Sequence, residues 1–172
     1  MTASKYDKYV VRKPSVVVRV GDEYIDKVPE GDVIPPGPRV IISNELIPGV
    51  TTKIEYGIIT GDTAAGTGED FMPHKHDYEE IFLMLGTDPQ DTSKLGCEVE
   101  FWLGEGEDLE KVVVTTSSAV YVPANVAHFP QIWKNVKRPV FTMVVMPTTG
   151  ERHLQLIDLE EGRKQICAHG GD

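Results

Sequence analysis

Two histidines and two acidic residues directly precede an apolar run in the stretch "MPHKHDYEEIFLMLG", residues 72–86. If this stretch is extended, His74 and His76 share one face, because side chains in a strand alternate between its faces. Glu79 and Glu80 follow within four residues of His76. Titratable groups that enter the inner face of a sheet need a partner, and one possible partner is a metal ion. The stretch therefore indicates either a metal site or a set of ordinary paired side chains.

This stretch resembles the first sequence motif of the cupin superfamily. That motif is a Gly, five residues, His-x-His, three or four residues, a Glu, and then roughly six residues to a second Gly. In this chain Gly68, His74, His76, Glu80 and Gly86 stand at these offsets. Glu79 is also within reach of the histidines, but the spacing from His76 favours Glu80 as the acidic residue of the motif.

A later stretch, "SSAVYVPANVAH" (117–128), is similar to the second cupin motif, which is a Gly, five residues, Pro-x-Gly, two residues and a His. Pro123 and His128 match. Three positions depart from the pattern. Ser117 replaces the opening Gly, Asn125 replaces the Gly of the turn, and Ile132 stands where an Asn usually follows the histidine. Asn tolerates a positive φ, so the tight turn is expected to survive.

The cupin resemblance implies an all-β fold, a double-stranded β-helix or jelly-roll barrel. It also implies that His74, His76, Glu80 and His128 bind one divalent transition metal ion per chain. Three imidazoles and one carboxylate suit Fe, Mn, Ni, Cu, Co or Zn, and such a set leaves coordination positions for water, oxygen or substrate. The ligand types do not decide among these metals.

A simpler alternative needs no metal. The histidines could be buried core residues or solvent-facing residues, and Glu80 could pair with Lys75 or Arg138. For the His-x-His pair alone this alternative is favoured. The combination of Glu80 with the Pro123–His128 turn shifts the balance toward metal binding.

Strand alternation also predicts the residues around the site. If Glu80 points inward, Phe82 and Met84 share its face, and Tyr121 is expected in the same pocket, on the strand that leads to His128. A regular strand would put Phe129, Gln131 and Trp133 opposite His128, but a bend at Pro130 could reverse this. An apolar pocket of this kind suits a small organic substrate. Glu79 and Tyr121 are the candidates for proton transfer.

The elements that must position these residues are short β-strands. Runs rich in β-branched and aromatic residues recur between Gly/Pro turn signals, and no long helical period is present. The predicted strands are 16–20, 39–43, 52–60, 80–85, 97–103, 111–116, 119–123, 140–146 and 153–159. The segment "GDTAAGTGED" (61–70) has no phosphate-loop Lys-Ser/Thr and is predicted to be a flap at the barrel mouth. Many short strands of this kind predict an all-β barrel or sandwich.

We divide the chain into an N-terminal arm (1–35), a cupin barrel (36–162) and a C-terminal tail (163–172). The arm contains "VVVRV" (16–20), which could extend the sheet of its own chain or pair with the sheet edge of a second subunit. The expected assembly is a homodimer, the commonest oligomer.

Composition excludes several classes of function. The chain has 172 residues, 40% of them hydrophobic, and a net charge of −10. This acidity argues against nucleic acid and against anionic membrane surfaces as partners. The two cysteines form no CxxC pair, the N-terminus lacks a signal-peptide core, and no apolar run approaches the roughly 20 residues that span a bilayer. These features predict a cytoplasmic protein.

The expected function is that of a metal-dependent enzyme acting on a small organic molecule. Cupins with this ligand set include dioxygenases, decarboxylases, isomerases and lyases, and the family's habits favour a dioxygenase-type oxidoreductase. The alternative from another class is a non-catalytic barrel that holds a metal and binds a small molecule.

Overall fold

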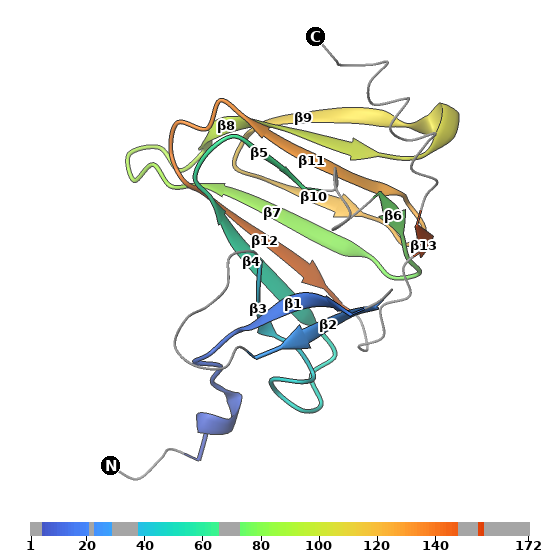
Figure 1. The fold of residues 1–172 in the computed structure, drawn as a ribbon. Coiled ribbons are helices and arrows are strands. Elements are labelled where there is room, and N and C mark those ends of the chain that lie inside the picture. The colour runs from blue at the N-terminus through green and yellow to red at the C-terminus, as the bar shows by residue number, and fades with distance from the viewer. Residues whose placement is uncertain (1–4, 21–22, 29–37, 66–72, 148–154, 157–172) are drawn as a thin grey trace.

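A computed structural model describes residues 5–20, 23–28, 38–65, 73–147 and 155–156 of the chain. These residues form β-strands and two short 3-10 helices, η1 (Asp7–Tyr9) and η2 (Gly106–Asp108). The strands make two antiparallel sheets that face each other (Figure 1). No helix within these ranges is long and apolar enough to cross a membrane.

The first sheet has seven strands in the order β10-β7-β12-β4-β3-β1-β2. They are β1 (Ser15–Val20), β2 (Glu23–Lys27), β3 (Arg39–Ile42), β4 (Lys53–Ile59), β7 (Glu80–Gly86), β10 (Ser118–Val122) and β12 (Val140–Met146). The second sheet has the order β13-β6-β11-β8-β9, with β5 paired to β11. Its strands are β5 (Thr63–Ala65), β6 (His74–Lys75), β8 (Lys94–Leu103), β9 (Glu110–Thr116), β11 (His128–Lys134) and β13 (Gln155–Leu156).

Strands distant in the sequence are neighbours in both sheets. β12 lies between β4 and β7, and β11 lies between β6 and β8. The chain thus crosses repeatedly between the sheets, as in a jelly roll. The all-β jelly-roll fold predicted from the sequence is confirmed.

Most strands lie within one or two residues of their predicted bounds. β11 is missing from the list of predicted strands, although the sequence left open a strand after His128 with a bend at Pro130. β5 occupies part of the predicted flap segment, and residues 66–72 of that segment lie outside the described residues. The C-terminal tail 163–172 also lies outside them.

The "VVVRV" segment forms most of β1, which pairs with β2 and β3 of the same chain. Of the two alternatives for this segment, the structure therefore has the one in which it extends its own sheet. The described part of the N-terminal arm thus adds the last two strands of the first sheet.

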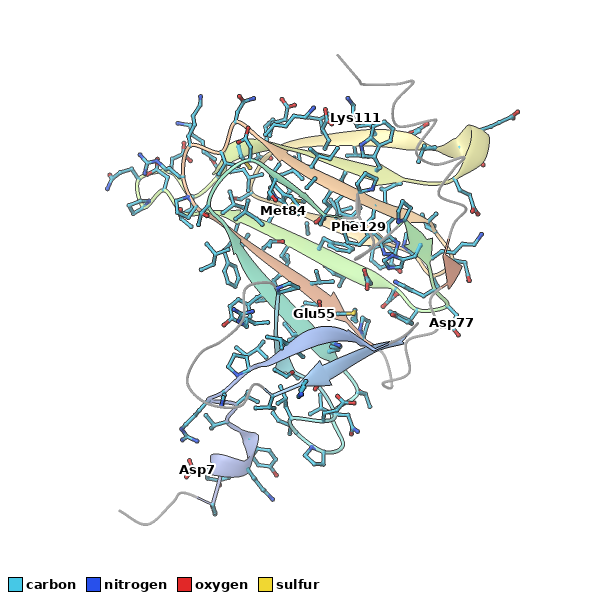
Figure 2. All side chains as sticks on the ribbon, in the orientation of Figure 1. Asp7, Glu55, Asp77, Met84, Lys111 and Phe129 are labelled. Carbon is cyan, nitrogen blue, oxygen red and sulfur yellow. The ribbon has the colours of Figure 1, made fainter. Side chains whose placement is uncertain are left out.

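The core between the sheets consists of two apolar clusters. One surrounds Met84 and includes Leu95, Val99 and Trp133, and the other consists of Phe82, Phe101 and Val122. Figure 2 shows Met84 and Phe129 between the sheets, at different positions along them. The second cluster lies beside the histidines described below.

Gly86 and Ser117, from the two motifs, meet at one edge of the barrel. The Gly86 N–H donates to Ser117 Oγ at 2.9 Å, and the Ser117 hydroxyl donates to the Thr92 carbonyl at 2.6 Å. Ser117 stands where the cupin pattern has glycine, and here its hydroxyl links the end of β7 to the start of β10.

We expect Gly86→Ala to lower the free energy of unfolding by about 1–3 kcal/mol or more, because the new Cβ would overlap the Lys94 carbonyl oxygen. Gly57→Ala is the matched control, since its Cβ would meet Thr142 Cγ2 at 3.5 Å, an ordinary contact. Urea unfolding of chelator-treated protein measures both. Equal stability of the two variants would show that the backbone at Gly86 can move aside.

Candidate metal centre

Three histidines from different parts of the chain meet inside the barrel. His74 lies on β6, His76 lies just beyond it, and His128 begins β11 directly opposite His74. All three are buried, at 6%, 4% and 1% exposure. Lys75, between the first two, is half-buried and pairs with Glu105. The prediction that His74 and His76 share the inner face is therefore confirmed.

The imidazole nitrogens of the three residues are close enough to share one ion. Their potential ligand atoms all lie within 4.8 Å of one another. The ring centroids of His74 and His128 are 4.4 Å apart, and those of His76 and His128 are 5.0 Å apart. A cluster of this geometry can bind a metal ion.

Glu80 completes the arrangement. It begins β7 and is 6% exposed, and its two carboxylate oxygens lie 3.3 Å from His76 Nε2 and 3.3 Å from His128 Nε2. Burial alone would raise the pKa of this carboxyl group, but the contacts with His128 and His76 outweigh it and lower the pKa to about 2. This lowering requires that the two rings donate to Glu80 or carry a positive charge, and a bound cation would act in the same direction.

The orientation of two rings is fixed by backbone carbonyls. His76 Nδ1 lies 2.6 Å from the Tyr78 carbonyl, and His128 Nδ1 lies 3.1 Å from the Val126 carbonyl. A carbonyl only accepts, so each Nδ1 carries the hydrogen and each neutral ring presents the Nε2 lone pair. Metal-bound histidines are commonly held in this way.

One feature of the structure shows that these residues fit a metal ion. Nε2 of His76 and Nε2 of His128 are buried and have no hydrogen-bond partner. Neutral rings with the hydrogen on Nδ1 would bring both Nε2 lone pairs against the Glu80 carboxylate without a donor between them, whereas protonated rings would donate to it. A divalent cation among these atoms would satisfy all of them.

Glu80 pairs with neither Lys75 nor Arg138, the two partners considered for it in the alternative without a metal. Lys75 pairs with Glu105, and Arg138 pairs with Asp88 at 3.3 Å. Glu80 instead faces the two histidines.

The turn of the second motif ties His128 to the first motif. Asn125 has φ 65°, so it takes the conformation expected for the residue that replaces the motif glycine. Its N–H donates to the His76 carbonyl at 2.7 Å. This bond fixes the loop before His128 against the strand end that carries His76.

A bulge in β11 decides which residues surround the site. The register with β8 shifts between His128 and Gln131, and Phe129 has φ 79°, which is rare for a bulky residue. Gln131 is consequently buried, at 3% exposure, as is Trp133, at 4%. The bend near Pro130 thus reverses the regular alternation, the second of the two possibilities left open by the sequence.

Aromatic rings form one side of the site. Phe129 lies 5.5 Å from the His74 ring and 5.8 Å from Phe82, whose ring is 5.9 Å from that of His128. Phe82 is therefore beside the site, as expected. Met84 shares its face but packs in the other apolar cluster. The sequence left the position of Phe129 open, because a bulge cannot be read from strand alternation.

Tyr78 is a second contact that the sequence did not reveal. Its ring stacks on that of His76 at 3.7 Å between centroids, with 6° between the planes. The feature of the sequence that points to this contact is the position of Tyr78, two residues after His76.

Tyr121 requires a correction. It is 54% exposed, whereas the next residue, Val122, is fully buried. Strand alternation therefore turns Tyr121 away from the interior, and it does not line the pocket. Its hydroxyl donates to Glu79 Oε2 at 2.6 Å, and this bond raises the pKa of Tyr121. Glu79 and Tyr121 form a pair outside the barrel.

We expect Glu80→Ala to weaken metal binding by about 10-fold or more and Glu79→Ala to leave it nearly unchanged, because only Glu80 faces the imidazoles. Titration of the metal-free protein with Co(II) or Zn(II) measures both affinities. The reverse order would transfer the acidic ligand to Glu79.

Comparisons with known proteins find solved structures that are similar to this chain at low sequence identity. No protein-family model and no curated protein matches the sequence. Among solved structures, Rru_A2000 of Rhodospirillum rubrum, a cupin-2 domain, is 11% identical with a TM-score of 0.47; the match covers 74% of this chain and 68% of the other. The polyketide cyclase RemF of Streptomyces resistomycificus is 13% identical, with a TM-score of 0.47 and coverages of 76% and 77%.

An oxalate oxidase structure is 15% identical with a TM-score of 0.47, and the match covers 81% of this chain but 61% of that chain. Other matched chains are longer, and the chain spans only 30% of a vicilin from hazelnut, Corylus avellana. The protein is an all-β jelly roll in which the histidines of both sequence motifs gather at one buried site.

Proposed function

We propose that the protein is a metal-dependent enzyme that acts on a small organic substrate, with dioxygenase-type oxidation as the leading reaction. The observation that carries the proposal is the convergence of the two unpartnered Nε2 atoms of His76 and His128 on the Glu80 carboxylate. His74 adds a third imidazole. The preference for oxidation within this class comes from the cupin resemblance.

The residues of the site would each contribute in a different way. His74, His76, His128 and Glu80 would hold the ion, and the single carboxylate would offset one of its two charges. The Nδ1–H bonds of His76 and His128 to backbone carbonyls keep both rings in place. A bound redox-active ion such as Fe(II) or Cu(II) would bind a substrate oxygen and activate dioxygen.

The aromatic residues restrict access of water on one side. Phe82 and Phe129 present ring surfaces next to the histidines, Phe101 packs against both of them, and none of the three offers a strong hydrogen-bond donor or acceptor. Such a wall suits the apolar part of a small organic molecule. Gln131 is a buried amide on the same strand as His128, and its Nε2 has no hydrogen-bond partner.

Oxygen consumption tests the proposal. The protein is freed of metal, reloaded separately with Fe(II), Mn(II), Cu(II) or Zn(II), and supplied with small aromatic and carboxylate compounds in an oxygen-electrode cell. Metal-dependent oxygen uptake with at least one compound, lost in His128→Ala, is the expected result. Val113→Ala, on β9 and 49% exposed, is the control variant.

Other outcomes discriminate among the alternatives. Product formation without oxygen uptake would favour a decarboxylase, isomerase or lyase. One bound ion per chain without turnover of any compound would contradict the enzyme proposal and favour a non-catalytic binding barrel. A protein that binds no transition metal would contradict the metal site itself.

A further inference from the structure

An ion pair lies inside the barrel, apart from the residues of the metal centre. Lys53 Nζ and Glu55 Oε1, both from β4, are 3.3 Å apart, and the two side chains are only 13% and 8% exposed. Glu55 lies directly opposite Val40 of β3 and Val144 of β12. Val40 is fully buried, and Val144 packs against the apolar cluster that includes Phe82. Residues directly opposite in antiparallel strands share a face, so the ion pair faces the interior.

Lys53 lies at the same end of the first sheet as Glu80. It is opposite Met146, the last residue of β12, and Val145 is opposite Ile81 of β7. Continuing this register places Met146 beside Glu80, so Glu80, Met146 and Lys53 form one row on the inner face. β7 begins, β12 ends and β4 begins at this end (Figure 1). Two strand spacings separate Lys53 from Glu80 by roughly 10 Å, and a lysine side chain covers much of that distance.

Stability alone does not account for this ion pair. Lysine and glutamate are rarely buried, because both groups lose their hydration. A buried ion pair regains this cost in part only, and apolar side chains of similar volume often stabilise a fold equally well. The position of the pair, on the interior face and in line with the metal centre, favours a role in binding a ligand.

The charges inside the barrel favour an anionic ligand. When a divalent ion is bound, the Glu80 carboxylate offsets one of its two charges, and Lys53 and Glu55 offset each other. Among the described side chains that lie inside the barrel, one positive charge therefore has no counterpart. Charge without a counterpart is costly where water is scarce. A ligand with a single negative charge would compensate it.

We propose that the substrate is a small monocarboxylate and that Lys53 binds its carboxylate group. This inference rests on the proposed function, since it names the class of molecule that the proposed enzyme takes. An ammonium group has three N–H donors and can donate to a ligand carboxylate as well as to Glu55. Phe82 lies in the row of Glu55, and its ring is 5.9 Å from that of His128. The apolar part of the ligand therefore has an aromatic surface between Lys53 and the histidines.

Calorimetric titration of the Zn(II)-loaded protein tests the proposal. The probes are acetate, benzoate and 4-hydroxybenzoate, each compared with its amide, which has nearly the same shape and no charge. The double variant Lys53→Met/Glu55→Gln removes the interior ion pair without changing the net charge. Lys111→Met/Glu100→Gln is the matched control, because it removes a 3.0 Å ion pair from the outer face of the second sheet, where alternation turns Glu100 away from the core.

The wild type should bind at least one carboxylate about 10-fold or more tightly than the corresponding amide, as expected for a charge-assisted contact. The interior double variant should reduce this preference to within about 2-fold, and the control should keep it. Glu55→Gln alone removes the negative charge next to Lys53 and should bind the carboxylate more tightly than the wild type does. Zinc content and thermal unfolding check that each variant is folded.

The zinc-loaded wild type would overturn the proposal if it preferred none of the carboxylates over its amide. Retention of the preference in the interior double variant would do the same. If that variant does not fold, Glu55→Gln decides, and carboxylate binding equal to or weaker than that of the wild type would count against Lys53. Calorimetry measures binding and needs no reaction, so carboxylate binding without turnover would contradict the enzyme proposal alone. A chain that binds no zinc would contradict the metal centre on which both proposals rest.

Discussion

Replacing His128 by alanine should reduce the metal content of the purified protein from close to one ion per chain to about one tenth or less. Loss of a ligand leaves His74, His76 and Glu80, which hold the ion with fewer bonds from one side of the site. Even loss of an outer contact to a ligand costs about 10–100-fold in affinity, so loss of the ligand itself should cost more. Inductively coupled plasma mass spectrometry of dialysed protein gives the ion count.

Matched variants show whether the loss of metal is specific to the histidines of the site. His76→Ala should lose metal as His128→Ala does, whereas Val113→Ala should retain it. A chelator should lower the melting temperature of the wild type and have little effect on His128→Ala, because an ion present at about 100 times its dissociation constant stabilises the fold by about 2.7 kcal/mol. Full metal retention in both histidine variants would remove these residues from the ligand set.

Truncation of Phe101 to alanine should lower the free energy of unfolding by about 3–5 kcal/mol. Phe101 is fully buried on β8, and its ring lies 5.0 Å from that of Phe82 and 6.3 Å from that of Phe129. Its loss would leave a cavity between the two sheets. Such a change is a large part of the 5–15 kcal/mol that stabilises a typical domain.

Chemical denaturation of chelator-treated protein measures this effect without a contribution from bound metal. Val113→Ala is the control, and its free energy of unfolding should stay within about 0.5 kcal/mol of the wild type. Because Phe129 separates Phe101 from the histidines, Phe101→Ala should also weaken metal binding, though less than a ligand substitution. A loss of stability below about 1 kcal/mol would mean that the surrounding core collapses to fill the space.

The sequence alone predicted the features that depend on local geometry. β-branched runs between turn residues identified most strands within one or two residues. Alternation placed His74 and His76 on one face, and the tolerance of Asn for positive φ preserved the turn at Asn125. These outcomes follow from the properties of a few consecutive residues, which are the same wherever the segment lies in the fold.

The tertiary structure decided everything that depends on which face is inside. Tyr121 and Val122 are both compatible with a buried strand position, and only the location of the second sheet turned Val122 inward and Tyr121 outward. The spacing from His76 favoured Glu80 over Glu79, and in the tertiary structure Glu80 faces the imidazoles. The bulge after His128 reversed the alternation of β11 and brought Phe129 against His74. Alternation fixes the relation between neighbouring residues, but the direction of the interior is set by pairing between strands far apart in the chain.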